Sequence, residues 1–91
     1  MSEDSSRPPN LPPPDEVLDT LGLYCPVPVW EAAKVIRRLE PGLVLELLSD
    51  DEGIEADMPV WCKRTGHPLV AMWREGSVYH VYVRKAPPSA T

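Results

Sequence analysis

The residues best suited to chemistry in this 91-residue chain are Cys25 and the two prolines that follow it, Pro26 and Pro28. Proline is well tolerated in the first turn of an α-helix, because the backbone N–H groups there have no partner inside the helix. The pattern therefore predicts a helix that begins at Pro26 and takes Cys25 as its N-cap residue. The sulfur of Cys25 would then lie at the positive end of the helix dipole.

A cysteine at the beginning of a helix can act as a nucleophile. A neutral thiol accepts hydrogen bonds poorly, whereas the helix dipole and the free amides of Val27 and Val29 would stabilise a thiolate. Because dipole effects at exposed sites are about 0.3–1 kcal/mol, we expect the pKa of Cys25 to fall by up to about one unit. A decrease of one unit would raise the ionised fraction at neutral pH to roughly a quarter. Cysteine is also among the most buried residue types, so these residues alone leave a role in the core open.

Six short elements are expected to position this cysteine. Five glycines separate apolar segments, in which alternating apolar residues predict strands and a spacing of three or four predicts helices. The predicted order is βαβαββ, and right-handed crossovers would place both helices on one face of the sheet. We therefore expect an α/β (α+β) two-layer sandwich with a four-stranded mixed sheet. The predicted strands are 17–21, 43–49, 69–74 and 78–84, and the predicted helices are 27–39 and 54–65.

Proline-rich segments mark both ends of the chain, since five of the 12 prolines lie within the first fourteen residues. We expect residues 1–14 to form a disordered Pro-rich tail, residues 15–85 a single domain and residues 86–91 a flexible C-terminal tail. Pro9 and Pro12 have the spacing of a PxxP docking ligand, although such patterns are common in solvated linkers.

Composition and charge exclude several classes of protein. The chain has 9 Lys and Arg against 14 Asp and Glu, which gives a net charge of −5 at pH 7. This is the wrong sign for unaided binding to a phosphate backbone, so we expect no direct nucleic-acid binding. The sequence has no apolar stretch of the length of a signal sequence or a membrane span. We therefore expect a cytoplasmic protein that does not enter a membrane.

The spacing of ligand residues does not indicate a metal or a cofactor. Cys25 and Cys62 belong to no CxxC motif or Cys/His cluster, so we expect two free thiols and neither disulfides nor zinc. The acidic residues before and within the second helix lack the spacing of an EF-hand loop. We expect them to cap that helix, with Ser49 and Glu52 forming a capping box. These acidic residues are Asp50, Asp51, Glu52, Glu55 and Asp57.

The segment Leu-Asp-Thr-Leu-Gly-Leu-Tyr-Cys-Pro-Val-Pro at 18–28, followed by Lys34, resembles the signature of the TusA/SirA family of sulfur-carrier proteins. The likeness continues through Asp50-Asp51, the segment Asp-Met-Pro-Val-Trp-Cys at 57–62 and Gly66-His67, and it covers residues 16 to 85. The resemblance implies a βαβαββ sandwich, which is the order predicted from the residues themselves. One departure is Tyr24, which stands where many relatives have an arginine that would favour the thiolate.

The resemblance also implies the chemistry of Cys25. It implies that Cys25 accepts sulfane sulfur as a persulfide and passes it on by an exchange of the thiol–disulfide type, without a metal or cofactor. The implied partners are a cysteine desulfurase or rhodanese-like sulfur donor and a downstream acceptor protein. The acceptor would belong to tRNA thiolation, molybdenum-cofactor assembly or sulfur metabolism.

The first helix is expected to present one buried and one exposed side. Trp30 and Lys34, with a weaker contribution from Arg37, form a candidate docking surface beside Cys25, and an ordinary solvated helix face is the alternative. Together with Pro26 and Pro28 at the helix start, Trp30 and Lys34 complete the predicted site. The residues expected to pack on the sheet are Val29, Ala32, Ala33, Ile36 and Leu39.

The remaining polar and sulfur-bearing residues are assigned to structure. Cys62 shares a side of the second helix with apolar residues and is expected in the core, with a role as a resolving thiol as the alternative. His67 and His80 have no partner identifiable from sequence. Strand alternation places His80 and Met72 on the side of the sheet away from the helices, which would be open to solvent or paired with another subunit.

Three functions follow from these residues. The leading hypothesis is a sulfurtransferase that carries a persulfide on Cys25. The second is a regulatory or adaptor module that binds a partner through Trp30 and Lys34. The third is a redox protein with a Cys25–Cys62 disulfide, which the spacing does not favour.

Overall fold

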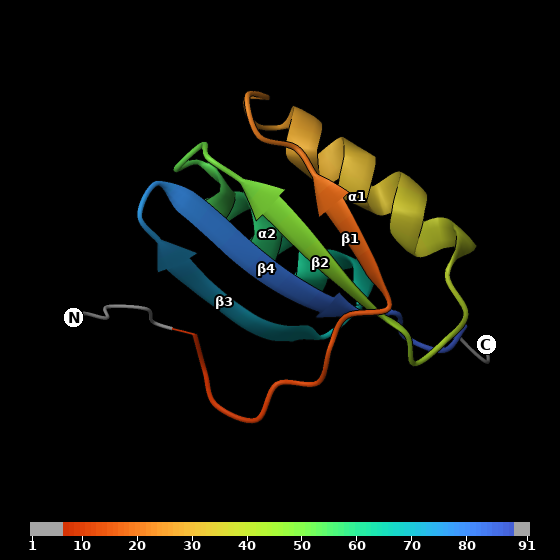
Figure 1. Cartoon of the computed structure of the whole chain (residues 1–91). Helices are drawn as coiled ribbons and strands as arrows, with labels where there is room; N and C mark the ends of the chain where they lie inside the picture. The colour runs from red at the N-terminus through yellow and green to blue at the C-terminus, as the bar shows by residue number, and fades with distance from the viewer. Residues whose placement is uncertain (1–6, 89–91) are drawn as a thin grey trace.

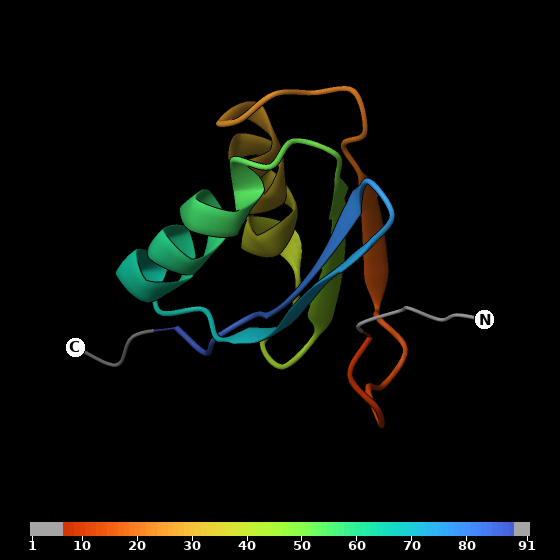
Figure 2. The same cartoon turned by 90° about the vertical axis from the view of Figure 1, so that its left-hand side faces the viewer.

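The computed structural model describes residues 7–88 and contains six elements in the order βαβαββ. The four strands form one mixed sheet in the order β1-β2-β4-β3, in which β1 is parallel to β2 and the other neighbours are antiparallel. Both helices cover the same face of this sheet (Figures 1 and 2). The predicted two-layer sandwich is therefore confirmed. The elements are β1 (Glu16–Asp19), α1 (Val27–Arg38), β2 (Val44–Ser49), α2 (Ile54–Thr65), β3 (Leu69–Glu75) and β4 (Val78–Arg84).

The predicted element boundaries agree with the observed ones to within two residues. The largest difference is at the end of β1, where Asp19 Oδ1 accepts a hydrogen bond from the N–H of Leu21 at 2.9 Å. Such a side-chain turn ends a strand by directing the backbone away from the sheet. The loop that leads to Cys25 therefore begins two residues earlier than the apolar pattern indicated.

The end of α1 is held by a residue distant in sequence. Lys85 Nζ donates hydrogen bonds to the carbonyl oxygens of Ile36, Arg37 and Leu39 at 2.7, 3.2 and 3.0 Å. The last carbonyls of a helix have no partner within the helix, and a cation there also complements the helix dipole. Lys85 thus satisfies the C-terminus of α1 and connects it to the end of β4.

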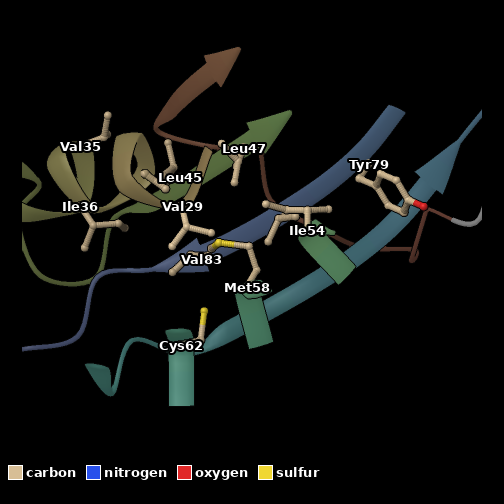
Figure 3. Packing of buried hydrophobic residues seen from close by; sticks show 12 residues of the cluster. Val29, Val35, Ile36, Leu45, Leu47, Ile54, Met58, Cys62, Tyr79 and Val83 are labelled. Atoms are coloured by element: carbon tan, nitrogen blue, oxygen red, sulfur yellow. The ribbon is translucent and has the colours of Figure 1, made fainter. Parts of the chain in front are cut away.

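The main core lies between the helices and the sheet (Figure 3). Cys62 is 4% exposed and belongs to this cluster, which confirms its predicted place in the core. On α1 the prediction was partly wrong, because Val35 is buried, whereas Ala33 and Leu39 are only partly buried. The face of α1 therefore follows the spacing 28, 29, 32, 35 and 36, since this stripe meets both the sheet and α2. Other members of the core are Leu45, Leu47, Ile54, Met58, Tyr79, Val81 and Val83.

A second cluster lies on the face of the sheet away from the helices, and it corrects one prediction. Met72 was predicted to lie beside His80 on this face, but it packs against the helix-side core. Trp73 takes the position beside His80 instead. The register of β3 shifts between Leu69 and Ala71, and such a bulge changes which side chains point to each face. The simple alternation used in the prediction could not include this shift. The buried residues of the second cluster are Val44, Trp73 and Tyr82.

The N-terminal segment supplies part of the cover of this second cluster. Leu11 packs against it, and the guanidinium of Arg7 lies 5.2 Å from the ring centre of Trp73. This part of the expected Pro-rich tail therefore contacts the domain, because it carries an apolar and a cationic side chain that fit an aromatic surface. At the other end, Ala86 of the expected C-terminal tail also contacts the domain, because its N–H donates to His67 Nδ1 at 3.0 Å. Residues 1–6 and 89–91 of the two expected tails lie outside the described residues.

Both histidines lie in contacts that support structural roles. His80 Nδ1 is 2.6 Å from Glu46 Oε2, and its ring stacks on Trp73 at 4.8 Å. His67 Nδ1 accepts a hydrogen bond from the N–H of Ala86 at 3.0 Å, next to the end of α2. Between residues 7 and 88, no helix is long and apolar enough to cross a membrane.

The side chain of Tyr82, in the second cluster, ends in a hydroxyl group. Its oxygen is buried and has no hydrogen-bond partner within residues 7–88. Because a buried unsatisfied hydroxyl is unfavourable, Tyr82→Phe should raise the free energy of unfolding by about 1 kcal/mol. Urea unfolding measures this change. A decrease of about 1 kcal/mol or more would contradict the prediction and indicate that the hydroxyl is bonded.

Candidate functional site

Cys25 lies in the loop between β1 and α1, where its side chain is partly exposed. The N-cap residue of α1 is Pro26 and the helix begins at Val27, so the prediction that Cys25 is the N-cap is wrong by one residue. Pro28 is accordingly the second helical residue. The N–H of Val27 was expected to face the sulfur, but it donates to the carbonyl oxygen of Tyr24 at 2.9 Å. The beginning of α1 therefore offers the sulfur less stabilisation than the sequence predicted.

A second loop, between β2 and α2, packs against Cys25. Because β1 and β2 are parallel neighbours, their carboxyl ends lie at the same edge of the sheet (Figure 1). Asp51 Oδ2 accepts a hydrogen bond from the N–H of Cys25 at 2.6 Å, and Asp50 Oδ1 accepts one from the N–H of Gly22 at 3.0 Å. The bond from Cys25 N–H, with another from Gly53 N–H, lowers the pKa of Asp51. The two aspartates therefore fasten one loop to the other.

This arrangement corrects the predicted capping role of the acidic segment. The N-cap residue of α2 is Gly53, and no side chain caps the helix there. Ser49 Oγ instead accepts a hydrogen bond from the N–H of Asp51 at 3.2 Å, so Ser49 and Glu52 do not form a capping box. The sequence contained a usable signal for the true role, because Cys25 and Asp51 each follow one of two strands joined by a helix, and strands joined in this way are commonly parallel neighbours.

The thiol of Cys25 is held in its protonated form. Burial raises its pKa to about 12, and the carboxylates of Asp51 and Asp57, which hydrogen-bond to the thiol, contribute to the same change. The predicted decrease in this pKa is therefore wrong. Loss of water around the sulfur and two negative charges outweigh the helix dipole, and Tyr24 supplies no compensating cation.

Two exposed aromatic side chains lie near Cys25 in the sequence. Trp30 is 58% exposed and Tyr24 is 77% exposed, and both lie close to Cys25 in sequence. A groove of about 320 Å³ lies between α1 and α2, and Trp30, Val60 and Asp57 are among its lining residues. Asp57, which lines this groove, also acts on the Cys25 thiol and so connects the groove with the cysteine.

The structure separates the two predicted docking residues. Trp30 lines the groove, whereas Lys34 does not, and Lys34 Nζ lies 3.2 Å from Glu31 Oε2 on the exposed side of α1. Pro26 is exposed, and Pro28 is buried in the first turn of α1. Sequence reasoning missed Asp51, Gly53 and Asp57 as neighbours of the cysteine.

The site contains a thiol, carboxylates and an apolar surface. Within residues 7–88 there is no group of three or more His, Cys, Asp and Glu side chains that could hold a metal ion. Cys25 and Cys62 are both free thiols, and Cys62 is buried. This arrangement can perform sulfur chemistry at Cys25 once the thiol has lost its proton.

Comparisons with known proteins give consistent results. The sequence profile of the family described as "Sulfurtransferase TusA" matches residues 16–85. A relative from Archaeoglobus fulgidus, described as a "Putative sulfur carrier protein", is 41% identical over 69 residues, which are 76% of this chain and 94% of the relative. The crystal structure of the SirA-like protein from Desulfitobacterium hafniense superposes with a TM-score of 0.69 at 24% identity, covering 79% of this chain and 99% of that protein. The similarity to the Desulfitobacterium protein supports the fold alone.

Proposed function

The chain belongs to the TusA family of sulfurtransferases, and we propose that Cys25 carries sulfur as a persulfide. The description of the Archaeoglobus relative as a "Putative sulfur carrier protein" supports this proposal. The main support is the difference in access between the two thiols. Cys25 is partly exposed at the edge of the sheet, whereas Cys62 is 4% exposed and packed in the core. A sulfur carrier must expose its sulfur to two partners in turn, and Cys25 is the thiol that meets this requirement.

The proposed transfer is an exchange between sulfur atoms. The thiolate of Cys25 attacks the terminal sulfur of a donor persulfide, a new S–S bond forms, and the S–S bond of the donor breaks. The donor leaves as a thiolate, and Cys25 becomes a persulfide. The acceptor then attacks the terminal sulfur of this persulfide, which restores the Cys25 thiolate. No external oxidant or reductant is needed for the transfer between donor and carrier.

The partners are proteins that can reach the thiol. A cysteine desulfurase or a rhodanese-like protein is proposed as donor, and the acceptor as a protein of tRNA thiolation, molybdenum-cofactor assembly or sulfur metabolism. Trp30 offers an exposed aromatic contact in the groove between α1 and α2, and Lys34 offers a charge on the exposed side of α1. The net charge of −5 supports protein partners rather than direct contact with nucleic acid. A cytoplasmic location, where thiols stay reduced, is part of this proposal.

The decisive experiment is the measurement of intact mass after sulfur loading. The chain is incubated with a cysteine desulfurase and L-cysteine, and we expect the mass to increase by one sulfur atom. Cys25→Ser should abolish this increase, and the matched variant Cys62→Ser should retain it. A gain that is lost in Cys62→Ser and kept in Cys25→Ser would overturn the assignment.

A second candidate function is an adaptor module that binds a partner through the exposed surface around Trp30. The raised pKa of Cys25 favours it, because a protonated thiol is a poor nucleophile. In this case Cys25→Ala would leave partner binding unchanged, and the wild-type chain would gain no sulfur.

A further inference from the structure

We propose that Gly53 and Asp57 hold Cys25 in a guarded resting position and so restrict its reaction to partners that displace the thiol or neutralise Asp57. This inference rests on the proposed role of Cys25 as the sulfur carrier. Gly53 then has a positioning role. Asp57 interacts with the reacting sulfur and controls whether that sulfur is ionised.

The contact between Gly53 and Cys25 is the first support. A Cβ atom added at Gly53 would lie 3.3 Å from Cys25 Cβ, 3.5 Å from Cys25 Sγ and 3.4 Å from Asp51 Oδ2. The backbone of Gly53 has helical angles, φ −59° and ψ −19°, which any residue can adopt. Glycine is therefore not required here for conformation. It leaves space in which the cysteine side chain and the Asp51 carboxylate lie close together.

The charged groups that face the thiol are the second support. Asp51 approaches from the β2–α2 loop and Asp57 from the first turn of α2, and both hydrogen-bond to the thiol. On the side of α1, Glu31 and Lys34 are paired with each other further along the helix. Two cations accompany these carboxylates, because Arg64 lines the groove with Asp57 and Arg74 lines a pocket with Asp51. The charged groups that act on the thiol itself are the two carboxylates, and both favour its protonated form.

Asp57 connects this resting position with the surface. Its side chain belongs both to the lining of the groove between α1 and α2 and to the surroundings of the thiol. A partner that enters the groove therefore contacts Asp57, one of the two carboxylates that act on the thiol. Displacing Asp57, or placing a cation beside it, removes one of the groups that keep the proton on Cys25. Small electrophiles and oxidants neither displace Asp57 nor bring a cation to it. The resting thiol therefore stays protonated in their presence and reacts slowly with them.

The test is the pH dependence of Cys25 alkylation by iodoacetamide in the full chain, followed by intact mass and peptide mapping. Asp57→Asn should shift the midpoint to lower pH by about one unit and accelerate alkylation at pH 8 about tenfold. The matched control is Glu55→Gln, which removes one carboxylate from the same turn of α2 but has no contact with the thiol among the described residues. This control should titrate like the wild type.

Gly53→Ala provides an independent variant. The added methyl group should push Cys25 away from Asp51 and Asp57, and alkylation at pH 8 should again become faster, with urea unfolding used to verify that the variant is folded. The inference is overturned if both Asp57→Asn and Gly53→Ala keep the wild-type pH profile. Sulfur loading by the desulfurase separates this result from the carrier function, because a wild-type chain that gains no sulfur contradicts the carrier whatever the alkylation profiles are.

Discussion

At pH 8, Cys25 of the folded chain should react with iodoacetamide about a thousandfold more slowly than the cysteine of an unstructured peptide. The nucleophile is the thiolate, and a thiol of pKa about 12 is ionised only about one part in ten thousand at this pH. A free cysteine with a pKa of about 8.5 is ionised to roughly a quarter. The rate should therefore increase about tenfold for each pH unit between 8 and 11.

The same chain in concentrated urea is the control for this prediction. Unfolding removes the burial and the fixed carboxylates, so both cysteines should then react at the ordinary rate. Because the pKa of a folded-state thiol is raised, its contribution to stability is present below the unfolded pKa and is lost as the pH rises toward 12. Cys62 behaves in the same way, since burial raises its pKa to about 11. A native rate equal to that of the peptide would refute the predicted protonation state.

Trp73→Ala should destabilise the chain by about 3–5 kcal/mol. Trp73 is 4% exposed although it lies on the face of the sheet away from the helices. It stacks on His80 at 4.8 Å and contacts the ring of Tyr82 at 5.5 Å. Its removal would leave a cavity and two rings without their neighbour, which is the costly type of core substitution. Urea unfolding measures the change in the free energy of unfolding.

Trp30→Ala is the matched control, because it removes the same side chain from an exposed position. Its free energy of unfolding should stay within about 0.5 kcal/mol of the wild type. We expect this variant instead to take up sulfur from a cysteine desulfurase more slowly, since Trp30 is exposed and lines the groove that also contains Asp57. A large loss of stability in Trp30→Ala, or none in Trp73→Ala, would contradict the observed burial.

Local patterns were sufficient to predict most of the fold. Both helices and all four strands lie where apolar spacing and the glycines placed them, because these signals act over a few residues. The order of the elements then limited the arrangement to helices on one face of the sheet. The position of Cys25 between the first strand and the first helix was predicted for the same reason.

Contacts between distant segments were not predictable in this way. Asp51 meets Cys25 from 26 positions away, and burial of the thiol, together with Asp51 and Asp57, reverses the expected direction of its pKa. The bulge between Leu69 and Ala71 depends on how β3 pairs with β4, so alternation assigned Met72 to the wrong face. Leu11 packs against the second cluster, and this apolar surface exists only once the strands have assembled into the sheet. In each case the deciding interaction joins segments that lie apart in the chain or on neighbouring strands.

The ammonium group that closes the far end of α1 limits how the protein can be trimmed or tagged. Lys85 is the last residue matched by the family profile, and its three bonds to α1 carbonyls come from the end of β4. A fusion partner attached after this lysine leaves the anchor in place. A chain cut at residue 84, or an acetyl group on the lysine, removes it and loosens the helix whose opposite end supports the cysteine loop.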